Sequence, residues 1–135
     1  MDASGILKEA RTVAVVGLSD KPERPSYDVA LYLQNHGYRV IPVNPMIKEW
    51  RGLKSYASLS DIPKSEKIDV VDIFRKSEDV PPIVDEAIRI GARAVWMQLG
   101  IVNEGAAGKA REAGLEVVMD KCMKIEHGRM HAPDI

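Results

Sequence analysis

The sequence predicts an α/β protein of the doubly wound class, with one five-stranded parallel sheet and helices on both of its faces. Short runs of β-branched and apolar residues recur along the chain, segments with helical spacing of apolar residues separate them, and several segments end at glycine. Strands that alternate with helices in this way form parallel sheets with right-handed crossovers. We expect the strand order 3-2-1-4-5, with the switch point beside the first strand.

Each expected element follows from the local pattern. A short helix over residues 4–10 precedes the first strand, with Ser4 as its N-cap. Pro81 and Pro82 fit only the first turn of their helix. In the tail from residue 120 we expect packing residues such as Cys122 and Met123, but assign no helix or strand. The expected strands are 12–16, 38–43, 69–74, 94–98 and 116–119. The further helices are 26–36, a short one near 58–62, one that begins at 78 or 80 and ends at 90, and 103–113.

Composition limits the classes of function. The 135 residues, 45% hydrophobic and 29% charged, suit one domain that spans residues 1–135. A net charge of −1 and 5% aromatic residues give no support for nucleic-acid binding. No apolar run approaches the ~20 residues of a membrane span, and the first residues lack a signal-peptide pattern. With a single cysteine as well, we expect a cytoplasmic protein, monomeric or homodimeric.

The segment that follows the first strand predicts a phosphate-binding loop. The apolar run Thr12–Val16 stops at Gly17, a polar loop with Lys21 and Arg24 follows, and a helix begins near Ser26. Ligands of open parallel sheets bind beyond the carboxyl ends of the strands. The first turn of a helix offers free backbone N–H groups and a positive dipole end, which suit a phosphate. The segment therefore predicts a nucleotide-type ligand over Gly17.

The motifs of dinucleotide binding and of P-loop proteins are absent. No second or third glycine follows Gly17 in the loop, and the second strand ends in Asn44-Pro45 rather than in an acidic residue. The pattern is Rossmann-like, but it lacks the close backbone approach to a pyrophosphate and the carboxylate that holds an NAD ribose. A site without that acid accepts a phosphorylated ribose.

Five segments resemble, in their order and spacing, the small stand-alone CoA-binding protein family. The resemblance spans about residues 7–129. It implies a Rossmann-like domain similar to the CoA-binding domain of the succinyl-CoA synthetase alpha chain, with coenzyme A as its ligand and no attached catalytic domain. The segments are Gly17–Ser19 with Lys21–Tyr27, Val43–Pro45, Asp72–Arg75, Trp96–Gly100 and Cys122–His127.

The chemistry of coenzyme A assigns roles to the strand ends. Backbone groups near Gly17 and the charges of Lys21 and Arg24 suit its phosphates. The end of the second strand suits the adenosine, and the end of the fourth suits the diphosphate or pantetheine. Cys122 is a possible contact of the CoA thiol, able to form a mixed disulfide. The expected cofactor-binding residues are Gly17, Leu18, Ser19, Lys21, Arg24, Val43, Asn44, Pro45, Phe74, Arg75, Gln98 and Gly100.

Each of these residue types also has a purely structural interpretation. Gly17 suits a tight turn, Lys21 and Arg24 suit a solvated loop, and Asn44-Pro45 suits a strand end. For the later segments, the structural interpretations are a core position for Phe74, an ion pair of Arg75 with Glu78 or Asp79, a buried amide at Gln98 and a small buried thiol at Cys122. Cys122, His127 and His131 lack an evident fourth zinc ligand, so we expect no metal.

We expect a non-catalytic protein that binds coenzyme A or an acyl-CoA as a carrier, sensor or regulatory module. No G-x-S-x-G motif is present, Asp72 lies inside a strand, and Asp120 is isolated, so enzymatic activity by this chain alone is disfavoured. Three competing functions stay open: an NAD(P)-type oxidoreductase, a subunit of an acyl-CoA synthetase-like enzyme, or a structural subunit whose CoA site has degenerated.

Overall fold

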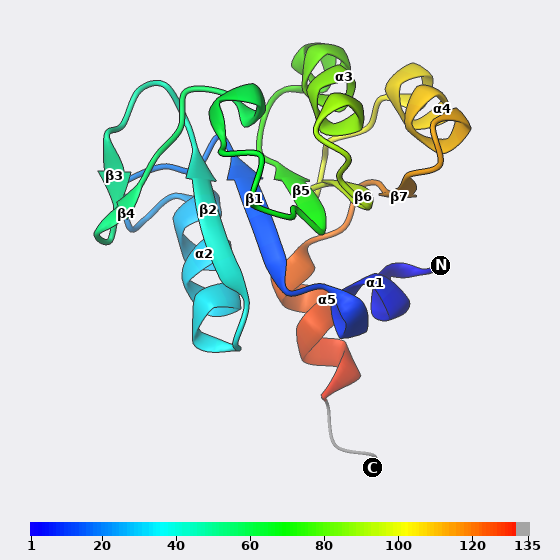
Figure 1. Cartoon of the computed structure of the whole chain (residues 1–135). Coiled ribbons are helices and arrows are strands. Elements are labelled where there is room, and N and C mark those ends of the chain that lie inside the picture. The colour runs from blue at the N-terminus through cyan, green and yellow to red at the C-terminus, as the bar shows by residue number, and fades with distance from the viewer. Residues whose placement is uncertain (132–135) are drawn as a thin grey trace.

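The computed structural model describes residues 1–131, which form one parallel sheet with helices packed against it (Figure 1). The sheet contains β1 (Thr12–Val16), β2 (Arg39–Val43), β5 (Val70–Ile73), β6 (Ala94–Met97) and β7 (Glu116–Val118), and β3 (Glu49–Trp50) pairs with β4 (Leu53–Lys54) in a small hairpin. The helices are α1 (Ala3–Glu9), α2 (Pro25–Asn35), α3 (Val80–Arg89), α4 (Glu104–Glu112) and α5 (Met123–Met130), with 3₁₀ turns η1 (Leu59–Asp61) and η2 (Ser77–Asp79).

Helices cover both faces of the sheet, as the sequence predicts. Alternate residues of each strand point to opposite faces, so Val13 and Val15 pack with α1, α2 and α5. Ala14 and Val16 pack on the other face with α3, α4 and η1. All four strand pairs of the sheet are parallel, and the α/β class is confirmed.

The strand order is β2-β1-β5-β6-β7. It differs in one place from the expected 3-2-1-4-5, because the third sheet strand along the chain, β5, pairs with β1 instead of lying beyond β2. Pro42 in β2 gives a physical reason. Its carbonyl accepts the N–H of Tyr56 on the outer side of the strand, 3.0 Å away, so the N–H that proline lacks would also face outward. A strand with such a residue fits the edge of a sheet and not its interior.

Three local elements differ from the expectations. Helix α5 forms in the tail, and the hairpin β3–β4 forms in the irregular segment after β2. Asp2, not Ser4, caps α1, because its carboxylate accepts the N–H of Gly5. None of the helices within residues 1–131 is long and apolar enough to cross a membrane.

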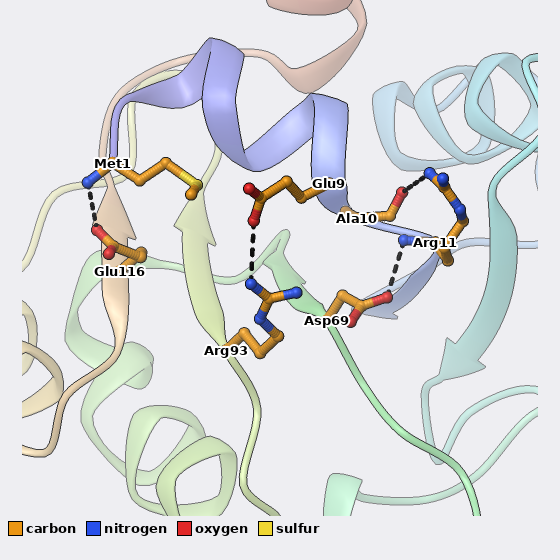
Figure 2. A network of polar contacts seen from close by, with 7 residues as sticks. All are labelled: Met1, Glu9, Ala10, Arg11, Asp69, Arg93 and Glu116. Carbon is orange, nitrogen blue, oxygen red and sulfur yellow. Dashed lines mark hydrogen bonds and ion pairs between the residues drawn. The ribbon is translucent and has the colours of Figure 1, made fainter.

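Polar contacts fasten α1 across the amino ends of the strands (Figure 2). The Asp69 carboxylate accepts the N–H groups of Arg11 and Thr12 at 2.8 and 2.9 Å, and Glu9 pairs with Arg93 at 3.0 Å. A hollow of about 460 Å³ lies beside this network, at the edge of the sheet opposite the carboxyl ends of the strands. Because charged residues of both signs already pair around it, it does not resemble an anion site.

Candidate functional site

A cavity of about 810 Å³ opens at the carboxyl ends of β1, β5 and β6, beside the beginnings of α2 and α5. This volume lies within the range of small-molecule sites. The chain leaves β1 for β2 on one side and returns to β5 on the other, so the switch point lies between β1 and β5. That point is where ligands of open α/β sheets bind.

The cavity brings together nine of the thirteen residues expected from the sequence. Leu18 and Val43 are buried in the two core clusters, Pro45 is exposed outside the cavity, and the Gly100 N–H donates to the Asp120 carboxylate at 2.7 Å. These four residues do not line it. The nine that do are Gly17, Ser19, Lys21, Arg24, Asn44, Phe74, Arg75, Gln98 and Cys122.

Gly17 shapes the loop at the end of β1. Its φ is +87°, and its N–H donates to the Val43 carbonyl at 2.8 Å. A Cβ atom at this position would clash with the carbonyl oxygen of Phe74, at the end of the neighbouring strand. Gly17 is therefore needed both for a left-handed turn and for the close approach of the loop to β5.

Serine hydroxyls fasten this loop to the first turn of α2. The Ser26 hydroxyl accepts the N–H of Ser19 at 2.9 Å, and the Ser19 hydroxyl accepts the N–H of Lys21 at 3.1 Å. Pro25 occupies the beginning of the helix, where its missing N–H costs nothing. The positive end of α2 therefore borders the cavity.

The cavity wall is strongly basic although the whole chain carries a net charge of −1. Lys21, Arg24, Arg75 and Lys76 line it, and no lining residue is acidic. None of the four forms an ion pair with another described residue, so the alternative partners Glu78 and Asp79 do not hold Arg75. Four unneutralised cations at one opening favour a ligand with several negative charges.

Asn44 supports the loop through both ends of its side chain. Its Nδ2 donates to the Leu18 carbonyl at 2.9 Å, and its Oδ1 accepts the N–H of Met46 at 2.9 Å. The residue is 8% exposed and lines the cavity. Its amide therefore holds β2 and the β1–α2 loop together, which is the structural role expected for it at a strand end.

Asp72 and Gln98 form a buried polar pair behind the cavity. Gln98 Nε2 donates to Asp72 Oδ1 at 2.5 Å, and Asp72 Oδ2 has no hydrogen-bond partner in the described part of the chain. Burial raises the pKa of Asp72 to about 8, and the bond from Gln98 opposes this shift only in part. Asp72 is therefore a neutral acid at pH 7.

Part of the cavity lining is apolar. Phe74 is half-buried and lines the cavity while it also packs against the core, and Leu99, Ile101 and Ile125 line it too. Half-buried Cys122 precedes the first turn of α5. This segment is held to the sheet by Trp96 Nε1, which donates to the Lys121 carbonyl at 2.8 Å.

The histidines of the tail lie apart from the cavity. His127 is 7% exposed, its Nδ1 is 2.9 Å from the Tyr32 hydroxyl, and its ring lies 4.5 Å from that of His131 and 5.2 Å from that of His36. Burial lowers the pKa of His127, and His131 and His36 lower it further. No three histidine, cysteine or acidic side chains within residues 1–131 are placed to hold a metal ion.

Sequence reasoning missed several lining residues. Lys76 directly follows Arg75 at the end of β5, so the strand-end argument that selected Arg75 applied to it as well. Ile125 belongs to α5, which the sequence pattern did not reveal. The other lining residues are Pro25, Ser26, Val29, Leu99 and Ile101.

Comparisons with known proteins show the family to which the chain belongs. Residues 11–128 match the CoA binding domain family. The Bacillus subtilis protein YneT is 43% identical over 90% of this chain and 89% of its own length. The crystal structure of a hypothetical protein from Pyrococcus horikoshii OT3 superposes with a TM-score of 0.91 at 43% identity, over 98% of this chain and 94% of the other.

A larger relative carries a similar domain. Subunit alpha of the ADP-forming acetate–CoA ligase II of Pyrococcus furiosus is 30% identical over 82% of this chain, which spans only 24% of that subunit. The family match over most of the chain and the likeness to proteins of the same length lead to one conclusion. The chain belongs to the CoA-binding domain family and is related to the corresponding domain of acetate–CoA ligases.

Proposed function

We propose that this protein binds coenzyme A or an acyl-CoA in the cavity at the carboxyl ends of β1, β5 and β6, as a non-catalytic carrier, sensor or regulatory module. The main support is that the cavity lining combines four cations with apolar side chains. Lys21 and Arg24 precede α2 and Arg75 and Lys76 follow β5, while Leu99 and Ile101 follow β6 and Ile125 lies on α5. A ligand with several phosphates on one part and an uncharged arm on the other matches this lining.

The proposal gives each part of the ligand a place. In it, the 3′-phosphate and the diphosphate lie near Ser19, Lys21, Arg24 and Arg75, with the adenosine toward the end of β2. The pantetheine arm runs past Gln98 toward Cys122. Leu18, Val43, Pro45 and Gly100 support this arrangement only through backbone or packing, because they do not line the cavity.

A binding role is favoured over catalysis by the chemistry of the wall. None of the lining residues is aspartate, glutamate or histidine, the usual general acids and bases. An NAD-type oxidoreductase is disfavoured because Asn44, not an acid, follows β2 and its amide is already hydrogen-bonded. The likeness to an acetate–CoA ligase subunit favours one second candidate, a CoA-binding subunit whose catalytic groups come from another chain.

Ligand ranking tests the proposal. We expect thermal stabilisation by coenzyme A to exceed that by dephospho-CoA, NAD or NADP, since a ligand that binds only the folded state raises its stability. Arg24→Gln should weaken coenzyme A binding about tenfold, because one charge-assisted contact is lost. Thermal unfolding ranks the ligands, and isothermal titration calorimetry measures the change in affinity.

Arg111→Gln is the matched control, since Arg111 is exposed on α4 and does not line the cavity. It should leave the affinity unchanged. Equal affinities of the native protein for coenzyme A and dephospho-CoA would remove the 3′-phosphate contact. Absence of any coenzyme A binding would refute the proposed function itself.

Cys122 should form a mixed disulfide when the protein is incubated with CoA disulfide. The Cys122 thiolate attacks one sulfur of the CoA disulfide, a new S–S bond joins Cys122 to CoA, and the second CoA leaves as a thiolate. Mass spectrometry should show one added CoA on the native chain and none on Cys122→Ser. Because the chain has a single cysteine, an unmodified native chain would place the CoA thiol away from Cys122.

A further inference from the structure

Asp72 is a carboxyl group enclosed by the sheet with no cation beside it. It lies in β5 between Val15 of β1 and Trp96 of β6, and it is 0% exposed. Gln98 is its hydrogen-bond partner, while Oδ2 has none among residues 1–131. An unpartnered buried polar atom costs stability, which favours a functional role for Asp72. Since Gln98 is its hydrogen-bond partner, that role acts through the Gln98 side chain.

The contact with Asp72 decides which end of the Gln98 amide faces the cavity. Gln98 lines the cavity and is 3% exposed. Gln98 Nε2 donates to Asp72 Oδ1, which leaves Oε1 on the other side of the amide. Gln98 Oε1 accepts no hydrogen bond from the described residues. It is also not one of their fully buried polar atoms without a partner, so it is accessible, and it faces the cavity that Gln98 lines.

An exposed amide oxygen selects for a hydrogen-bond donor. It repels phosphate oxygens, which are acceptors, but it accepts from an amide N–H. Its surroundings agree, because Gln98 is followed along the chain by Leu99 and Ile101, which also line the cavity. Resting on the proposed function, we propose that Asp72 is a positioning residue that holds Gln98 Oε1 toward the cavity, where it accepts an amide N–H of the pantetheine arm.

The ionisation of Asp72 supplies a second observable. Burial is the main cause of its raised pKa, about 8, and no charged neighbour contributes to the shift. The ionisable groups that the surrounding elements present at the cavity are Lys21 and Arg24 before α2, Arg75 and Lys76 after β5, and Cys122 before α5. Above pH 8 the carboxylate adds a negative charge behind an anionic ligand, which weakens binding.

Two ligands separate the positioning role from a general structural effect. Adenosine 3′,5′-bisphosphate carries phosphates but no pantetheine arm, so it serves as the probe of the contacts with the cations. Asp72→Leu removes the hydrogen-bond partner of Gln98, and should weaken coenzyme A binding about fivefold at pH 7, the worth of one neutral hydrogen bond. Binding of adenosine 3′,5′-bisphosphate should be unchanged. Between pH 7 and 9 the advantage of the native protein over the variant should shrink.

Gln98→Met provides an independent variant and completes a double-mutant cycle. Its affinity for coenzyme A should also fall about fivefold. The affinity of the double variant should fall no further than that of either single variant. Equal losses for both ligands, or a native affinity ratio and pH profile in Asp72→Leu, would overturn the inference. If the native protein binds adenosine 3′,5′-bisphosphate but not coenzyme A, or neither, the proposed function fails first.

Discussion

The free energy of unfolding of Asp72→Asn should depend less on pH than that of the native protein, by about 1.4 kcal/mol per pH unit between pH 4 and 8. Burial raises the pKa of Asp72 from 3.8 to about 8 in the folded state. At pH 7 the unfolded chain has lost this proton and the folded chain keeps it. Folding must therefore take up a proton, at a cost on the order of 4 kcal/mol at this pH.

The direction of this effect is set by the raised pKa. The cost is absent below pH 3.8, grows as pH rises and levels off above about 8. Urea denaturation at pH 5, 6, 7 and 8 measures it, and the difference between the two proteins cancels other titrating groups. The asparagine amide that replaces the carboxyl group must itself be buried, which also costs free energy. The variant should therefore be more stable than the native protein at pH 7 by only ~2 kcal/mol, less than the full cost of proton uptake. A difference that stays constant from pH 5 to 8 would show that Asp72 ionises normally.

Gly17→Ala should destabilise the fold by about 3 kcal/mol and weaken coenzyme A binding as well. A left-handed φ of +87° costs an alanine about 1 kcal/mol. The added methyl group also clashes with the Phe74 carbonyl oxygen and approaches the Arg75 side chain, and backbone oxygen in a strand does not move freely. Relief of the clash must separate the β1–α2 loop from β5 and widen the phosphate side of the cavity.

Gly37→Ala isolates the clash from the backbone conformation. Gly37 has a similar φ of +91°, and a Cβ atom there would have no neighbour within 4 Å. This control should lose only about 1 kcal/mol and bind coenzyme A normally. Chemical denaturation and calorimetry on both variants test the comparison. Equal destabilisation at the two positions would mean that the loop can retreat from β5 at no cost.

Much of the architecture could be predicted because each strand and helix has a local signal. Thr12–Val16 followed by Gly17 marked a buried strand and its ligand-side turn, and the structure has that strand at the same residues. The order of the strands is a non-local property, which periodicity does not determine. Pro42 nevertheless contained the missing information, since a proline inside a strand favours the edge of a sheet. In the order 3-2-1-4-5 the second strand is not at an edge.

The candidate site was less predictable than the fold. Strand-end reasoning selected Gly17, Arg75 and Gln98, because parallel strands bring their carboxyl ends to one edge. It could not reveal α5, whose sequence includes Gly128 and lacks a marked apolar side, so Ile125 was not recognised as part of the wall. It also passed over Asp72, since only the three-dimensional environment shows a carboxyl group without a cation.

The pairing of Tyr56 with β2 has a consequence for self-association. Exposed sheet edges present unpaired backbone groups that recruit strands from other molecules. At β2 this edge is occupied by the chain's own Tyr56 and interrupted by Pro42. Addition of a foreign strand is therefore hindered near the end of β2, and at the opposite border β7 offers only Glu116–Val118 for pairing.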